Sequence, residues 1–141
     1  MTAATDHGER ASVGRRLAGV GIDWVLCLLI SSAFFAVPAA AELSPVERVL
    51  VAGAPLATVG IWMAQHLILV ATLGSTTGHR LLGMRVVRVD GSPVVGLVKA
   101  LIRTVLLALV IPAVVWDGEG RGLHDSAAGT RIVVARARAA R

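Results

Sequence analysis

Hydrophobic residues gather in three long stretches of the chain, at residues 17–40, 49–73 and 97–116. As a helix, the first stretch would be about 36 Å long, which is enough to cross a membrane core of ~30 Å with some tilt. The second stretch is similar in length, and a short polar turn at residues 42–48 separates the two. We therefore expect the chain to cross a membrane at residues 17–40 and to return at residues 49–73.

The third stretch, residues 97–116, contains Lys99, Arg103 and Pro112. Its uncharged part, residues 104–116, would form a helix of only about 20 Å, shorter than the membrane core. Two arrangements remain open. If the stretch crosses, the arginine-rich tail lies outside the cell; if it enters the membrane and returns, the tail stays in the cytosol. The tendency of positive charges to stay inside favours a cytosolic tail.

Two short runs rich in β-branched residues, 85–89 and 130–135, have the composition of strands. We expect them to pair on the cytosolic surface, whereas the glycines in residues 74–83 are expected to loosen the chain before them. The predicted fold is a mostly α membrane protein, a helical bundle of about three apolar segments with a small cytosolic β-element. The expected parts are a flexible cytosolic tail (1–13), a membrane domain (14–135) and an arginine-rich tail (136–141).

Composition agrees with a membrane protein. Of the 141 residues, 55% are hydrophobic and only 16% are charged, whereas soluble domains have roughly 25% charged residues. The net charge is +5, but the basic residues lie at the edges of apolar stretches. This placement indicates contacts with anionic lipid headgroups, from Arg121, Arg131 and the tail above all, and argues against nucleic acid. Cys27 is the single cysteine, so no intrachain disulfide forms.

A cleaved signal peptide is an alternative interpretation of the first stretch. Arg15 and Arg16 precede an apolar run, and the Pro-Ala-Ala-Ala sequence at residues 38–41 has the small residues of a cleavage site. Against cleavage, Asp23 interrupts the run near its start, and the rest of the chain still has membrane character. We therefore expect a retained span.

Asp23 is the main candidate for chemistry, because an ionisable group inside a membrane segment is costly unless it has a partner. Counting residues from the cytosolic edge puts His66 of the second stretch at about the same depth, roughly 10 Å, with Gln65 beside it. Arg103 of the third stretch can reach the same level. Two interpretations remain open: a proton or cation site with Asp23 as the binding group, or a structural ion pair that holds three helices together.

A second cluster consists of Arg121, His124 and Asp125, with Arg80 and Arg85 expected opposite. Asp125 is predicted to be the N-cap of a short helix or to form a salt bridge with Arg80 or Arg85. The ligand spacing of a metal site is absent, and residues 74–83 do not have the lysine of a nucleotide-binding loop. No base is suitably spaced from Cys27 or the serines of the first stretch. We therefore expect neither enzymatic activity nor a cofactor.

Several motifs, in a fixed order, resemble those of the RDD family of small bacterial membrane proteins. They begin with Arg16 and Asp23, continue with the Gly-Ser-Thr-Thr-Gly-His-Arg-Leu-Leu-Gly sequence of residues 74–83, and end with Leu-His-Asp-Ser-Ala-Ala-Gly-Thr at residues 123–130. The resemblance covers about residues 14–135, and it maps the arginine and two aspartates of the family's name onto Arg16, Asp23 and Asp125. This chain has His79 where the family commonly has a lysine. The family template has three spans, which favours a crossing by residues 97–116.

The resemblance implies a multi-pass protein of the bacterial plasma membrane with a cytosolic N-terminus. The lone intramembrane acid and the resemblance together favour transport of ions or protons. A chain with one such acid would need several copies to conduct, so a homo-oligomer or a membrane-protein partner is expected. The alternative is a non-catalytic accessory or scaffold subunit of a larger membrane assembly.

Overall fold

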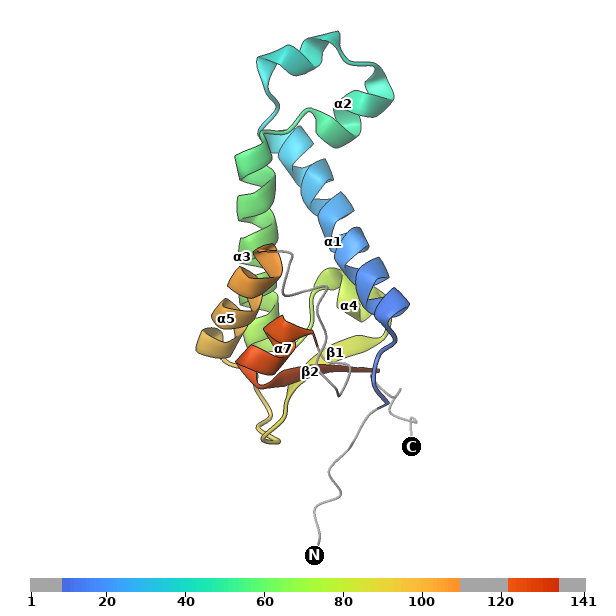
Figure 1. Ribbon diagram of the computed structural model, residues 1–141. Helices are drawn as coiled ribbons and strands as arrows, with labels where there is room; N and C mark the ends of the chain where they lie inside the picture. The colour runs from blue at the N-terminus through green and yellow to red at the C-terminus, as the bar shows by residue number, and fades with distance from the viewer. Residues whose placement is uncertain (1–8, 110–121, 135–141) are drawn as a thin grey trace, which may run out of the picture.

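Two long apolar helices form the spine of the computed structural model, which describes residues 9–109 and 122–134 (Figure 1). Helix α1 (Val13–Phe34) and helix α3 (Pro55–Leu73) pack against each other. Both are long and apolar enough to cross a membrane. Together they confirm the mostly helical prediction, with two long apolar helices rather than three in the described part of the chain.

The ends of these helices differ from the expected spans for local reasons. Helix α1 begins at Val13, four residues early, because the side chain of Ser12 caps it by accepting a hydrogen bond from the backbone N–H of Arg15 (3.3 Å). It ends at Phe34, before Pro38. Helix α3 begins only at Pro55, whose missing N–H is harmless at the first helical position. The expected boundaries at residues 17, 40 and 49 were therefore wrong.

The connection between α1 and α3 is folded, whereas a simple polar turn was expected. It contains a 3-10 helix, η1 (Pro38–Glu42), and helix α2 (Pro45–Val51), which lie at the far end of the spine in Figure 1. A capping box starts α2: Ser44 and Glu47 each accept a hydrogen bond from the other's backbone N–H. We call the segment formed by residues 35–54 the outer lobe.

A two-stranded sheet closes the opposite end of the spine. Strands β1 (Met84–Arg88) and β2 (Thr130–Val134) pair antiparallel, with Met84 opposite Val134 and Arg88 opposite Thr130. The predicted strand pairing is therefore confirmed. The N-terminal segment joins the same layer through its backbone. Arg10 forms an isolated antiparallel β-bridge with Val133, and the N–H of Ala11 donates to the carbonyl of Ile132 (3.2 Å). Residues 9–12 of the expected flexible tail thus pack against β2.

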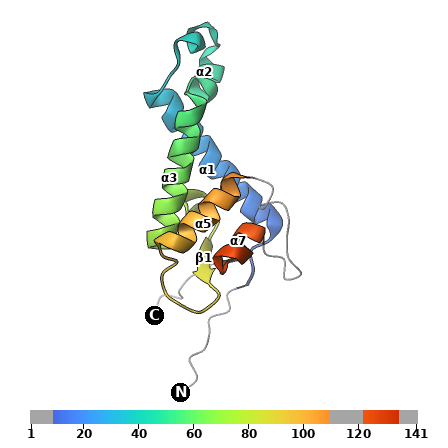
Figure 2. The same ribbon diagram turned by 60° about the vertical axis from the view of Figure 1, so that its left-hand side comes forward.

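Three shorter helices cover this layer. Helix α4 (Thr77–Leu81) packs against α1, and helix α5 (Leu97–Ala108) packs between α3 and α7 (Leu123–Ala128), as the two views in Figures 1 and 2 show. Helix α5 is about 18 Å long, so it does not cross a membrane core of ~30 Å by itself. The rest of the third apolar stretch, residues 110–116, lies outside the described residues, as do residues 1–8 and 135–141.

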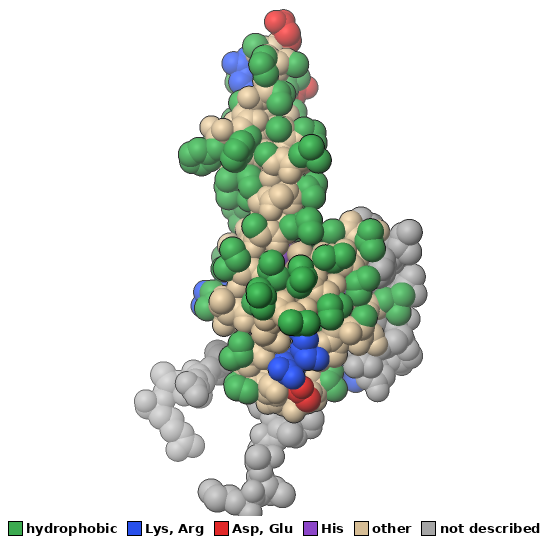
Figure 3. Space-filling view, turned by 90° about the vertical axis from the view of Figure 1, so that its left-hand side faces the viewer, with side chains coloured by type: hydrophobic (Ala, Val, Ile, Leu, Met, Phe, Trp, Pro, Cys, Tyr) green, Lys and Arg blue, Asp and Glu red, His purple; other side chains and the backbone are tan. Residues whose placement is uncertain are grey.

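Helix α5 is amphipathic in an unusual sense, because its exposed face is apolar and its buried face contains an arginine. Its buried residues are Ala100, Arg103, Thr104 and Leu107. Large exposed hydrophobic side chains cover the other face: Leu97, Val98, Leu101, Ile102 and Val105. Figure 3 shows hydrophobic side chains along the whole column, with charged side chains mainly towards its two ends. This distribution suits a surface in contact with lipid.

Candidate functional site

Asp23 lies in the middle of α1 with no solvent exposure, and its carboxylate accepts three hydrogen bonds. Gln65 donates to Oδ1 over 3.0 Å, and the backbone N–H of Gly78 donates to the same oxygen over 2.7 Å. The hydroxyl of Thr76 donates to Oδ2 over 2.5 Å. Three donors from two other segments therefore offset the cost of burying this carboxylate.

His66 completes this cluster from α3. Its Nδ1 lies 3.1 Å from the carbonyl oxygen of Trp62, and its Nε2 lies 3.8 Å from Oδ2 of Asp23. The ring also packs against the indole of Trp62, with centroids 4.2 Å apart. The structure thus brings together Asp23, Gln65 and His66, the three residues placed at one depth by counting along the first two spans.

Helix α4 is held by Asp23 and in turn buries it. Thr76 caps α4 by accepting a hydrogen bond from the N–H of His79 (3.2 Å), and the N–H of Thr76 donates to Nδ1 of His79 (3.3 Å). Gly78 lies so close to Gly19 of α1 that an added Cβ would stand 2.9 Å from the carbonyl carbon of Gly19. The glycines of residues 74–83 were expected to loosen the chain, but Gly78 fixes it to α1.

The sequence led us to expect that Arg103 would pair with Asp23, but it does not. It forms a buried salt bridge with Asp125 of α7, and both side chains are almost fully shielded from solvent. Thr130 of β2 donates to Oδ1 of Asp125 (2.9 Å), and Nε2 of His124 lies 3.5 Å from Oδ2. The ion pair therefore joins α5, α7 and the sheet, and it leaves Asp23 to uncharged donors and His66.

Asp125 is also not the N-cap of its helix. Helix α7 begins at Leu123 after the N-cap Gly122, and Asp125 is its third residue. Arg80 and Arg85, the partners expected for Asp125, are exposed, and within the described segments neither forms a salt bridge with it. Both predictions for Asp125, an N-cap and a salt bridge with Arg80 or Arg85, were therefore wrong. Its salt-bridge partner is Arg103 of α5.

Comparison with known proteins identifies the chain. The RDD family matches it over residues 10–129, which is most of its length. The chain belongs to the RDD family. Searches of curated proteins and of solved structures found no match. The three residues that the family resemblance singles out lie in different places in this RDD domain: Asp23 in the α4 anchor, Asp125 in the Arg103 pair, and Arg16 in the lining of a pocket.

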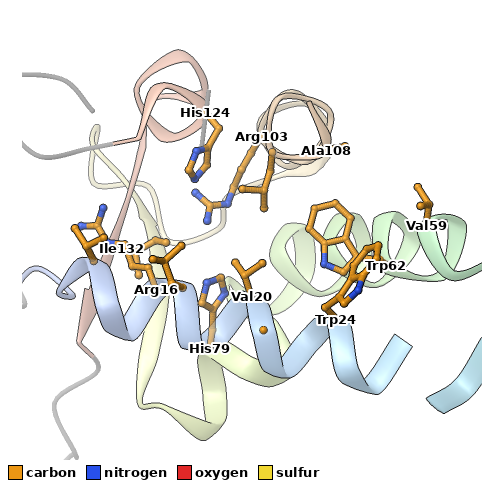
Figure 4. A pocket seen from close by; sticks show the side chains of 14 residues that line it. Arg16, Val20, Trp24, Val59, Trp62, His79, Arg103, Ala108, His124 and Ile132 are labelled. Carbon is orange, nitrogen blue, oxygen red and sulfur yellow. The ribbon is translucent and has the colours of Figure 1, made fainter. Parts of the chain in front are cut away.

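That pocket, of about 640 Å³, lies among α1, α3, α4, α5 and α7 of the RDD domain. Figure 4 shows Arg16, His79, Arg103 and His124 around one end of it, with Trp24 and Trp62 towards the other. None of the described lining residues is acidic. The four basic side chains come from four helices, so no single stretch of sequence reveals them as neighbours.

The positive charges around the pocket affect the pKa of His79. Burial, together with the positive charges of Arg103 and other nearby basic groups, lowers the pKa of its imidazole to about 3. His79 is therefore neutral at physiological pH. Because its Nδ1 accepts the hydrogen bond from Thr76, the ring proton lies on Nε2.

Metal binding gains no support from these side chains. The described residues contain no group of three histidine, cysteine or acidic side chains placed to hold an ion. Two side chains of ligating type near the pocket have other partners: His79 accepts the cap hydrogen bond of α4 from Thr76, and Asp125 pairs with Arg103. What the arrangement offers chemically is a buried acid–imidazole pair and a pocket rich in donors.

Proposed function

We propose that this RDD protein is a transport-related membrane protein in which Asp23 and His66 hold one exchangeable proton. One observation carries the proposal, the 3.8 Å separation between Nε2 of His66 and Oδ2 of Asp23 in a site without solvent exposure. We also propose that the cluster works without a metal or cofactor and that the protein is not an enzyme.

The hydrogen-bond pattern explains why this site is suited to one proton. The carbonyl of Trp62 can only accept, so Nδ1 of His66 carries a hydrogen. In neutral His66, Nε2 then has a lone pair directed towards the neighbourhood of a carboxylate oxygen. One added proton turns this repulsion into an attraction, whether it resides on the imidazole or on the acid.

The same carboxylate links proton binding to the backbone. Asp23 holds Thr76 and Gly78 at the start of α4, so protonation of Oδ2 would weaken the acceptor of the Thr76 hydroxyl. Helix α4 leads directly into β1. Protonation of Asp23 can therefore change the position of α4 and, through it, of the sheet layer. A transporter needs this kind of coupling between proton binding and conformation.

The membrane placement that we propose follows the charges. The sheet layer and α4 contribute Arg80, Arg85, Arg88 and Arg131, whereas the outer lobe balances Arg48 with Glu42 and Glu47. By the positive-inside tendency, the sheet layer and the N-terminus lie in the cytosol of a bacterium, beside anionic headgroups, and the outer lobe lies outside. Because each chain has one such acid, we propose that it acts as a homo-oligomer or with a membrane-protein partner.

Proton flux in proteoliposomes tests the proposal. Purified protein is reconstituted with a pH-sensitive dye inside, and a pH gradient is imposed in the presence of Na⁺ or K⁺. We expect wild-type protein to collapse the gradient faster than empty liposomes. Asp23→Asn removes the exchangeable proton but keeps an acceptor for Gln65 and Gly78, so its flux should fall to the empty-liposome rate.

Asp90→Asn is the matched control, because Asp90 is exposed and its contacts are confined to its own turn. It should conduct like wild type. Transport at Asp23 is ruled out if wild-type protein conducts no protons, or if a folded Asp23→Asn protein conducts as well as Asp90→Asn. Should Asp23→Asn fail to fold, His66→Asn makes the same comparison from the other partner.

The accessory or scaffold role remains the second candidate, and the saturation of Asp23 favours it. A carboxylate with three donors and no exposure is a sound structural anchor even if it never exchanges a proton. In that case Asp23→Asn lowers the stability of the protein, and neither the wild type nor this variant conducts protons. A partner membrane protein then copurifies with the wild type.

A further inference from the structure

The pocket described above has the chemistry of an amphiphile site, with hydrogen-bond donors at one end and an apolar wall at the other. It is separate from the proton site, since neither Asp23 nor His66 is among its lining residues. Its volume, about 640 Å³, lies within the range typical of small-molecule sites, roughly 300–1,000 Å³.

At the polar end, two buried side chains have donors that no described residue uses. Arg103 is 2% exposed, and apart from its ion pair with Asp125, its Nε has no hydrogen-bond partner in the described segments. His79 is 1% exposed, and its Nε2–H, fixed by the bond from Thr76 to Nδ1, makes no hydrogen bond to any residue that the structure describes. In Figure 4 both side chains are directed into the same space. A buried donor such as Nε of Arg103 is costly without an acceptor, so this end is suited to an anionic oxygen ligand.

At the other end, the pocket is lined by apolar side chains of the two spanning helices. Arg16 and Trp24 are eight residues apart on α1, which is about 12 Å along the helix. The lining residues Leu17, Trp24 and Val59 are exposed, at 61%, 39% and 38%, and belong to the two spanning helices. The pocket therefore opens on the surface that faces the hydrocarbon, where a soluble anion would have no access but a lipid would.

We infer that this pocket binds one anionic membrane lipid, with its phosphate at Arg103, His79 and Arg16 and one acyl chain along Trp24 and Trp62. Charge complementarity selects the headgroup, and the apolar opening towards the bilayer selects a lipid over free phosphate. The lipid gives an acceptor to the donors of Arg103 and His79 that no described residue uses, and it fills the apolar space between α1 and α5.

Trp62 supplies the assay, because it is only 5% exposed and yet lines the pocket. In the full-length protein, Trp24→Phe and Trp116→Phe leave Trp62 as the single tryptophan. Phosphatidylglycerol or phosphatidylcholine with brominated acyl chains is titrated into detergent-solubilised protein, and quenching of Trp62 is recorded. We expect brominated phosphatidylglycerol to quench at a concentration at least about fivefold lower, the effect of one arginine near an anionic headgroup.

Two pairs of variants separate the site from general lipid contact. Gly21→Leu places a side chain in the pocket lining where nothing stands within 4 Å of the new Cβ, and Gly60→Leu makes the same change on α3 outside the lining, also with free space. Arg16→Gln removes a lining charge, and Arg15→Gln removes one from the exposed neighbour. Gly21→Leu should abolish Trp62 quenching, Arg16→Gln should abolish the headgroup preference, and both controls should behave like wild type.

Other outcomes overturn the inference. Equal quenching by the two lipids, or unchanged quenching in a Gly21→Leu protein that melts no lower than wild type, shows that no anionic lipid occupies the pocket. If excess inorganic phosphate removes the preference for phosphatidylglycerol, the site takes a free anion instead. The proton-flux result has no bearing on any of these readings, so the two proposals fail separately.

Discussion

Gly78→Ala tests the anchor between α4 and α1 most directly, because the structure predicts an effect opposite to the local one. In a helix, replacing glycine by alanine normally stabilises by about 1 kcal/mol. At Gly78, however, the new Cβ would stand 2.9 Å from the carbonyl carbon of Gly19 and 3.1 Å from Cγ of Asp23, and it would be closer still to the carbonyl oxygen of Gly19. Neither the backbone of α1 nor the buried carboxylate can move away easily.

The expected cost has two sources. Forcing an extra carbon into a packed contact costs roughly 1–3 kcal/mol. Moving α4 away from α1 also lengthens the 2.7 Å hydrogen bond from the N–H of Gly78 to Asp23, and a bond to a charged group contributes about 1.5–3 kcal/mol. After the helical gain is subtracted, we expect a net destabilisation of about 2–4 kcal/mol.

Thermal unfolding in detergent measures this change, with Gly60→Ala as the control. Gly60 lies in α3, and apart from the adjoining backbone of α3 no described atom stands within 4 Å of the place where the Cβ of an alanine would lie. That variant should therefore melt at or slightly above the wild-type temperature. The Gly78→Ala midpoint should fall by roughly 10 °C. A Gly78→Ala protein that melts as high as Gly60→Ala would refute the close approach of α4 to α1 and the support it gives to Asp23.

Two further predictions concern the other buried groups. Asp125→Asn leaves Arg103 buried without its counter-ion, so the free energy of unfolding should fall by about 3–5 kcal/mol. The exposed control Asp90→Asn should melt close to wild type, and similar melting of the two variants would contradict a buried pair. His79 has a pKa of about 3 in the folded protein and an ordinary value of 6.5 when unfolded. Because the folded value is lowered, its contribution is complete above pH 6.5 and is lost as the pH falls towards 3, by about 2 kcal/mol at pH 5. Melting at pH 7.5 and pH 5 should show this loss, and His79→Asn should remove most of it.

The sequence could predict the Asp23 cluster because depth in a membrane is a matter of counting. Two antiparallel helices that begin and end at the same surface bring Asp23 and His66 to one level, whatever the details of packing. The pairing of β1 with β2 was also predictable, since both runs are β-branched and similar in length. These features depend on periodicity and length, which the sequence states directly.

The partners of the acids could not be predicted in the same way. Arg103 reaches Asp125 rather than Asp23 because α7 folds back onto α5, a tertiary contact that no spacing reveals. Helix α4 has five residues, too few to stand alone, and it is stabilised by the cap at Thr76 and the acceptor at Asp23, fifty-three positions away. Some signals were present and overlooked: Ser12 before α1 and Pro55 at the start of α3 are ordinary helix-start residues.

The pairing of β1 with β2 restricts how the chain threads a bilayer. Hydrogen-bonded strands lie on the same side of any membrane that α1 and α3 cross, so the chain between Arg88 and Thr130 must traverse it an even number of times. Since Arg10 bridges Val133, the start of the chain shares that side. For a membrane crossed by α1 and α3, we therefore propose an even number of crossings, in contrast to the three spans of the family template.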